Sequence, residues 1–253
     1  HMPFFKPGYI DGLQNKVSMK VSQLLDEAEK LNEFNLVREI SQQLPIYTLS
    51  EILGIPESDR QKLVEWMEFL ELAQYFTLEQ IKQNEEGITD TTPDPALVEM
   101  FDNMIDEMFD YGRFILNKKK EKPENDLLSA IANAKIAGED LSQEFLDGSW
   151  LLIVFAGNDT TRNTMSGGIK LLHENPEQKQ LVIDDFERVT GLINETVRYV
   201  SPVIHMRRTS LEETVIGEQR IGPYEKIALW YGAANRDPEI FDDPDKFNIM
   251  RTN

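Results

Sequence analysis

The stretch of this sequence with the clearest chemical potential is FAGNDTTRN, residues 155–163. It places an acid, Asp159, beside two hydroxyls, Thr160 and Thr161, directly after the apolar run WLLIVFAG. A carboxylate next to an alcohol can pass protons between solvent and a buried reaction centre. We therefore take Asp159 and Thr160 as candidate catalytic residues.

Small side chains follow one stripe of this segment if the helix continues through it. Helical spacing brings them together, and they are Ala156, Gly157, Thr160, Thr161, Thr164, Gly167 and Gly168. Such a stripe lets a bulky group approach the backbone closely. Two simpler explanations are the close packing of another helix and an N-cap that restarts a helix, and the spacing alone favours these.

Two further groups of charged residues have a spacing that could matter. Glu195 and Arg198, in ETVR, stand three residues apart, which permits an ion pair worth about 0.2–0.5 kcal/mol on a helix surface. The segment ESDR at 57–60 has the same spacing, so the pair alone indicates little. Arg207 and Arg208 could bind a carboxylate through parallel hydrogen bonds. A solvated surface pair is the alternative, above all for Arg207.

Helices are expected to position most of these groups, because apolar residues recur every three or four positions from about residue 11 to residue 200. The longest predicted helix covers 140–175, with Asp140 or Ser142 as N-cap and Pro176 as its end. A shorter helix is predicted over 126–138.

The chain changes character after Pro202. The segments TVIGEQRI (214–221) and KIALWYGA (226–233) alternate apolar and polar residues and are separated by GPYE. This pattern predicts a β-hairpin between the two segments. The expected fold class is thus mainly α, a multi-helix fold with a small β-hairpin or sheet.

Composition narrows the function classes. The 253 residues carry a formal net charge of −19 and include no cysteine. The charge disfavours nucleic acid as a partner, and the lack of cysteine excludes disulfides, zinc thiolate sites and cysteine nucleophiles. No apolar run approaches the ~20 residues of a membrane span. We therefore expect a cytoplasmic protein without a membrane span.

The order of several motifs resembles one family. AGNDTT is similar to the motif in the long central helix of cytochrome P-450 enzymes, the haem-thiolate monooxygenases, and ETVR resembles their glutamate-x-x-arginine helix. YVSPVIHMRRTS and GAANRDPEIFDDPDKFNIMR resemble the segments that follow it. The resemblance, to the bacterial soluble type, implies one cytochrome P-450-like domain over 1–253, helical over 11–200 with a small β region over 201–253.

The resemblance also implies roles for individual residues. Haem would be the cofactor, contacted by Ala156, Gly157 and Thr161, with an arginine on a propionate. Arg208 is the candidate for that arginine and Arg207 is its neighbour.

For catalysis, the resemblance implies that Thr160 holds a water and a hydrogen bond during oxygen activation, that Asp159 delivers protons, and that Glu195 and Arg198 form a structural ion pair. The enzyme would insert one oxygen of dioxygen into a hydrophobic small molecule. Its electrons would come from a ferredoxin or a reductase.

The sequence departs from that family in one severe respect. The family's haem iron is ligated by a cysteine, and this chain has none. His1, His173 and His205 are no evident substitutes, so no metal ligand is assigned. We expect an internal part of a monooxygenase that lacks the N-terminal region and the cysteine loop, so that haem binding by this chain alone is doubtful. The alternative is a haem-free remnant that acts as a non-catalytic binding module or scaffold.

Overall fold

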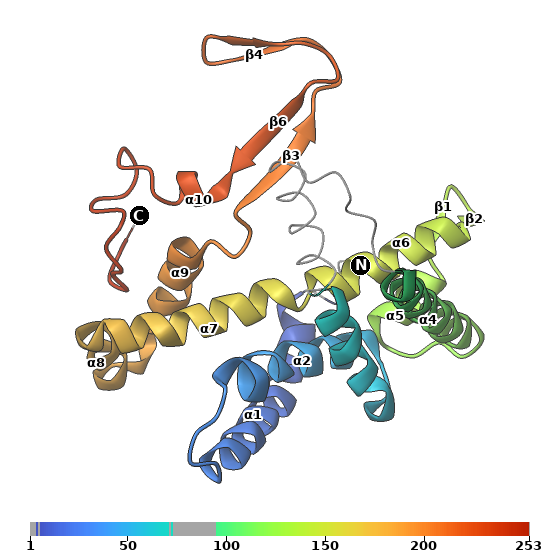
Figure 1. The fold of residues 1–253 in the computed structure, drawn as a ribbon, viewed down its shortest axis with the longest axis horizontal. Helices are drawn as coiled ribbons and strands as arrows, with labels where there is room; N and C mark the ends of the chain where they lie inside the picture. Colours follow the sequence, from blue (N-terminus) through green and yellow to red (C-terminus); the bar gives the residue numbers. More distant parts are fainter. Residues whose placement is uncertain (1–3, 5, 71, 73–94, 253) are drawn as a thin grey trace. The chain divides into compact units, whose positions relative to one another are not determined.

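A computed structural model describes Phe4, residues 6–70, Leu72 and residues 95–252 (Figure 1). The chain divides into two compact units, His1–Asn158 and Asp159–Asn253. The mainly helical fold class with small antiparallel sheets is confirmed. That residues 1–253 form a single domain stays a prediction. Among the described residues, no helix combines the length and the apolar character that crossing a membrane requires.

The first unit consists of helices and one short two-stranded ribbon. Its elements are α1 (Pro7–Glu29), the π-helical turn η2 (Val37–Ser41), α2 (Gln43–Leu53), the 3-10 turn η3 (Glu57–Asp59), helical residues 60–70, α4 (Pro95–Glu121), α5 (Leu127–Ala132), β1 (Lys135–Ile136), β2 (Glu139–Asp140) and α6 (Gln143–Ala156). α1 packs on α2, and α4 packs on α5 and α6 (Figure 1). One hydrophobic core joins all the main helices of this unit.

Side-chain caps fix two of its helix starts. Ser142 accepts a hydrogen bond from the amide of Phe145 and begins α6, as one of the two predicted caps. Asp126 accepts one from the amide of Ser129 at 2.7 Å and begins α5. The end predicted for that second helix, Gly138, is wrong.

The helix predicted over 126–138 stops at Ala132 because the chain turns into the β1–β2 ribbon. Ala137 (φ 53°) and Gly138 (φ 88°) form its turn, in a backbone region that ends a right-handed helix and that glycine adopts at little cost.

The long helix predicted over 140–175 is interrupted. α6 ends at Ala156 with Gly157 as C-cap, and α7 (Asp159–Glu174) begins at the second residue after this cap. Glycine has the lowest helix propensity after proline, and an acid such as Asp159 is favoured in a first helical turn. The predicted end is confirmed, because α7 stops just before Pro176.

The second unit combines four helices with two β-ribbons among its described residues. Its elements are α7, α8 (Pro176–Asp184), the 3-10 turn η4 (Phe186–Arg188), α9 (Val189–Val200), β3 (His205–Thr209), β4 (Thr214–Ile216), β5 (Gln219–Ile221), β6 (Lys226–Trp230) and α10 (Tyr231–Ala234). α9 lies along α7, and the β4–β5 hairpin extends the β3–β6 ribbon (Figure 1). Its small core is built on Leu171, Phe247 and Ile249.

The strands pair differently from the predicted hairpin. β4 and β5, both inside the segment 214–221, pair with each other around Gly217, whose φ of 60° suits a tight turn. β6 pairs antiparallel with β3, in the register Arg208 to Ile227. The predicted hairpin is therefore wrong: 214–221 contains two strands, and of 226–233 only β6 is a strand, because α10 begins at Tyr231. The alternation pattern could not identify the partner of β6, which lies upstream of the hairpin.

Two glycines in the helices of the first unit offer a matched test of packing. A Cβ on Gly112 of α4 would lie 2.5 Å from Cδ1 of Trp150, whereas a Cβ on Gly148 of α6 would meet no atom within 4 Å. We expect Gly112→Ala to lower the free energy of unfolding by about 1–3 kcal/mol, as overpacking does. Gly148→Ala should raise it by up to about 1 kcal/mol. Urea unfolding followed by circular dichroism measures both, and equal effects would contradict the packing described.

Candidate functional site

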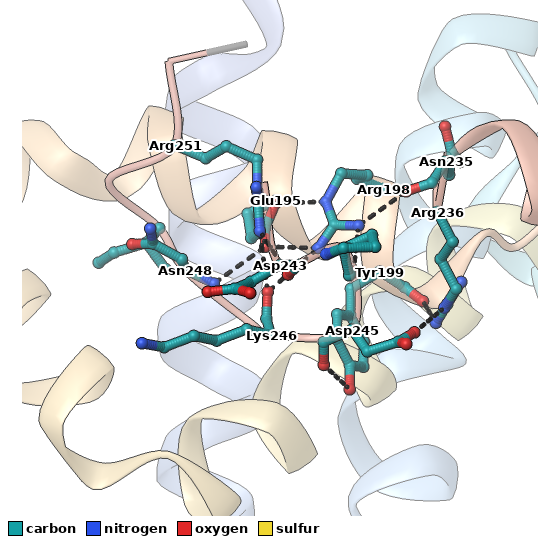
Figure 2. Close-up of polar contacts among 12 residues, drawn as sticks. Glu195, Arg198, Tyr199, Asn235, Arg236, Asp243, Asp245, Lys246, Asn248 and Arg251 are labelled. Carbon is teal, nitrogen blue, oxygen red and sulfur yellow. Dashed lines mark hydrogen bonds and ion pairs between the residues drawn. The ribbon is translucent and has the colours of Figure 1, made fainter. Parts of the chain in front are cut away.

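The most deeply buried ionic contact of the second unit joins Glu195 and Arg198 of α9 (Figure 2). Nε and Nη2 of Arg198 donate to the two carboxylate oxygens of Glu195 at 2.7 and 2.8 Å. The side chain of Glu195 is only 2% exposed and that of Arg198 only 6%. This fork geometry, with two parallel hydrogen bonds, is the strongest form of an arginine–carboxylate contact.

A third member of this cluster, Arg251, was missed by sequence reasoning. Its Nε lies 3.3 Å from Oε2 of Glu195, and the amide of Asn248 donates to Oε1 at 2.9 Å. These residues stand more than fifty positions from Glu195 in the sequence, so no helical or strand spacing connects them. Only the return of the chain along α9 brings them to the carboxylate.

The two arginines also hold the irregular segment before the C-terminus. Arg198 donates to the backbone oxygens of Asn235 at 2.7 Å and Pro244 at 2.8 Å. Arg251 donates to those of Asp242 at 2.6 Å and Lys246 at 3.0 Å. Carbonyl groups of this irregular segment thus receive charged donors from the two arginines. The cluster of Glu195, Arg198 and Arg251 fixes the course of this segment.

The surroundings of Glu195 keep it ionised. Burial by itself would raise the pKa of its carboxyl group. The hydrogen bonds from Arg198 and from the Asn248 amide, with the charges of both arginines, outweigh burial, so the pKa lies below its usual range. The carboxylate therefore carries its charge at neutral pH.

The second segment with the same spacing, ESDR, behaves differently. Arg60 is paired with Glu51 of α2 rather than with Glu57, which is exposed. Three-residue spacing alone thus did not determine the partner, since the carboxylate of another helix lies closer.

The candidate acid–alcohol pair lies at the start of α7. Asp159 is the first residue of this helix, and its Oδ1 accepts a hydrogen bond from Nη2 of Arg162 at 2.5 Å. Its side chain remains 39% exposed. Thr160 is half-buried and Thr161 is exposed. The arrangement gives a charged, solvent-accessible carboxylate next to a half-buried hydroxyl.

Ala156 and Gly157, the last residue and the C-cap of α6, are both exposed. On one side, a Cβ at Gly157 would lie 3.0 Å from Cδ1 of Leu49 and 3.0 Å from the carbonyl oxygen of Ile153. The contact that requires glycine here is therefore with α2. The exposed side of both residues carries no bulky side chain and leaves the backbone accessible.

The later part of the small-residue stripe is used for helix packing. A Cβ on Gly167 would lie 2.5 Å from Cγ2 of Val200, and one on Gly168 would lie 3.0 Å from Cγ2 of Thr196. α9 therefore packs closely on α7 at these two glycines. A Cβ on Gly191, within α9, would collide with the backbone oxygen of Ile249. The packing interpretation thus applies to Gly167 and Gly168.

Arg207 and Arg208 lie on β3, all of whose residues are exposed. Successive side chains of a strand point to opposite faces, so the two guanidinium groups cannot serve one face together. Arg208 donates to the backbone oxygen of Arg207 at 2.9 Å, and neither guanidinium has a carboxylate partner among the described residues. Either is therefore available to a carboxylate ligand, which suits a haem propionate. In contrast, no thiolate for iron exists in this chain.

Asn158 was not singled out by sequence reasoning. It is completely buried, and within the described part of the chain neither its amide nitrogen nor its amide oxygen has a hydrogen-bond partner. Buried amides normally bind protein or water. The residue stands inside the motif between Gly157 and Asp159, where α6 has ended and α7 has not begun.

The carboxylate of Glu195 can be tested against that of Glu57. Glu195→Ala leaves two guanidinium groups buried without their anion, so we expect a loss of about 3–5 kcal/mol in the free energy of unfolding. Glu57→Ala, at an exposed position, should change it by less than about 0.5 kcal/mol. Urea unfolding at pH 7 compares the two variants.

The same carboxylate predicts a pH dependence. Since the pKa of Glu195 is lowered on folding, its stabilisation is present above the unfolded pKa of about 4.3 and is lost as pH falls through the folded pKa. The stability difference between the wild type and Glu195→Gln should therefore shrink below about pH 4. A difference that stays constant from neutral pH into this range would show that the carboxylate is not held ionised.

Comparisons with known proteins agree with this arrangement. The model of the cytochrome P450 family matches residues 16–252. Linalool 8-monooxygenase of Pseudomonas putida is 29% identical over 99% of this chain and 58% of that enzyme. Cytochrome P450 109 of Bacillus spizizenii is 30% identical over 98% of this chain and 58% of that protein.

A solved structure gives the same result at the level of the fold. The Mycobacterium marinum cytochrome P450 in complex with pseudoionone superposes with a TM-score of 0.85, at 28% identity, over 99% of this chain and 58% of that one. The chain thus spans somewhat more than half the length of the relatives it matches. Motif order, buried ion cluster and fold agree with one another, and the chain belongs to the cytochrome P450 family.

Proposed function

We propose that the complete protein carrying this chain is a haem-dependent monooxygenase that inserts one oxygen atom of dioxygen into a hydrophobic small molecule. The observation that carries the proposal is the family match over residues 16–252, which includes the acid–alcohol pair at the start of α7. The exposed residues Ala156 and Gly157 support it, as does the guanidinium group of Arg208, which has no carboxylate partner in the part of the chain that the structure describes.

Each unit of this chain contributes candidate residues for haem binding. Ala156, Gly157 and Thr161 offer exposed, small surfaces on which a flat macrocycle can rest. Arg208 offers a guanidinium group to a propionate, with Arg207 on the opposite face of β3. The haem supplies the binding and reduction of dioxygen, while its iron takes a thiolate in this family. That thiolate would come from a residue that is not among these 253.

Proton delivery is the task we assign to the start of α7. Asp159 reaches solvent and is held by Arg162, so it can exchange a proton with water once this pair loosens. The hydroxyl of Thr160, on the next residue, both donates and accepts hydrogen bonds. Thr160 would hold a water and pass the proton onward from Asp159. The pair thus controls when protons arrive, and the cofactor supplies the oxidising power.

The substrate and the electron donor follow from the family. Linalool appears in the name of one relative and a steroid in that of another, and a solved relative contains pseudoionone. We infer a hydrophobic substrate of this general kind. A ferredoxin or a reductase would supply the electrons.

A carbon-monoxide difference spectrum of the complete protein tests the proposal directly. A haem-thiolate enzyme gives the red-shifted Soret band that a thiolate ligand imposes on the reduced iron. A purified protein that takes up no haem would instead favour the alternative, a haem-free binding module or scaffold. If haem is bound, a panel of hydrophobic ligands can be screened for those that shift the spin state of the iron, and these ligands identify the substrate class.

Thr160→Ala, in the complete protein, tests the assigned hydroxyl. We expect haem content to be unchanged, because Thr160 is not an iron ligand, while a larger share of the reducing equivalents appears as hydrogen peroxide. Thr190→Ala, on an exposed position of α9, is the matched control and should leave the share unchanged. The ratio of peroxide formed to reductant consumed measures the effect. Unaltered coupling in Thr160→Ala would remove Thr160 from the mechanism.

A further inference from the structure

Three oxidisable side chains of the first unit are in mutual contact, and we call Trp66, Tyr111 and Trp150 the aromatic triad. Their ring centroids lie 5.3 Å apart for Trp66 and Tyr111, 5.9 Å for Tyr111 and Trp150, and 6.3 Å for the two tryptophans. They come from three helical segments, residues 60–70, α4 and α6. Rings at these separations pack directly, with no other group between them.

The two tryptophans are sealed from solvent. Trp66 and Trp150 are each 1% exposed. The indole nitrogen of Trp150 donates to the backbone oxygen of Met108 at 3.0 Å, and Gly112 makes room for its ring. A radical formed on either indole would therefore be shielded from water and from dissolved oxygen.

Tyr111 is the member of the triad with a route for a proton. Its hydroxyl donates to Oδ2 of Asp59 at 2.8 Å, and the ammonium group of Lys62 lies 5.8 Å from the centre of its ring. Burial, followed by the hydrogen bond to Asp59 and its charge, raises the pKa of Tyr111. The phenol thus keeps its proton in the resting protein. An oxidised phenol is a strong acid, and Asp59 is placed to accept that proton.

We propose that the aromatic triad is a one-electron oxidation site that stores an oxidising equivalent as a neutral tyrosyl radical on Tyr111. An outer-sphere one-electron oxidant removes an electron from one of the rings. Because the rings are in contact, an electron from a neighbouring ring can replace it, so that the electron hole moves among the three. The hydroxyl proton of Tyr111 passes to Oδ2 of Asp59, which leaves a phenoxyl radical and a neutral carboxylic acid. A one-electron reductant such as ascorbate later restores the phenolate, which takes the proton back.

This site differs from the proposed monooxygenase site in its residues and in its chemistry. All of its members belong to the first unit, and its formation needs an oxidant of sufficient potential but no haem. The two proposals can therefore fail independently.

Photochemical oxidation of the 253-residue protein tests the proposal. A ruthenium tris-bipyridine complex is excited in the presence of a cobalt(III) pentaammine quencher, which generates the oxidant, and samples are frozen for high-field electron paramagnetic resonance. We expect the signal of a slowly decaying, hydrogen-bonded tyrosyl radical, and we expect its yield to fall severalfold in Tyr111→Phe. Tyr224→Phe, at a side chain with 76% exposure, is the control and should remove only a rapidly decaying component.

A second variant keeps the phenol and removes the proton acceptor. Asp59→Asn retains an oxygen that can accept the hydrogen bond, but a neutral amide takes up a proton far less readily than a carboxylate. We expect the Tyr111 radical to form severalfold more slowly. Circular dichroism verifies that each variant is folded. If Tyr111→Phe does not fold, the rate measured in Asp59→Asn tests the proposal by itself. A slowly decaying radical of undiminished yield in Tyr111→Phe, or an unchanged rate in Asp59→Asn, would overturn the proposal.

Discussion

The second unit depends on one buried anion, the carboxylate of Glu195. This unit has only a small apolar core, and its segment from Asn235 to Arg251 has few of the backbone hydrogen bonds of regular helices and strands. Arg198 and Arg251 supply the missing donors, and both are held in position by Glu195. A buried ion pair adds little net stability by itself. Its contribution here is to give an irregular segment a single conformation.

The first unit is held together by different forces. Its core is apolar and aromatic and extends through all its main helices. Close contacts are made possible by glycine, as where Gly112 receives Trp150. Such a unit depends on shape and volume, whereas the second depends on charges that satisfy backbone carbonyls. The motif at 155–163 contains the boundary between the two units, which lies between Asn158 and Asp159.

Local chemistry was predictable from the sequence, and partners distant in the chain were not. Ser142 as a cap and Pro176 as a stop follow from rules that act within a few residues. The interruption after Ala156 was less clear, because glycine and asparagine weaken a helix without forbidding it. The ion pair of Glu195 with Arg198 lies within reach of a spacing rule, while Arg251 depends on how the chain returns. The roles assigned to the site residues remain predictions.

α9 is enclosed by backbone on two sides. Gly167 and Gly168 of α7 receive its side chains, and its own Gly191 touches the carbonyl oxygen of Ile249. The contact at Gly191 lies between backbone atoms and has no rotamer to adjust, whereas those at Gly167 and Gly168 are made by the side chains of Val200 and Thr196. The helix that begins with Asp159 and Thr160 therefore packs directly on the helix that carries Glu195, and the backbone contact at Gly191 joins that second helix to the segment before the C-terminus, so a displacement of α9 would reach both neighbours.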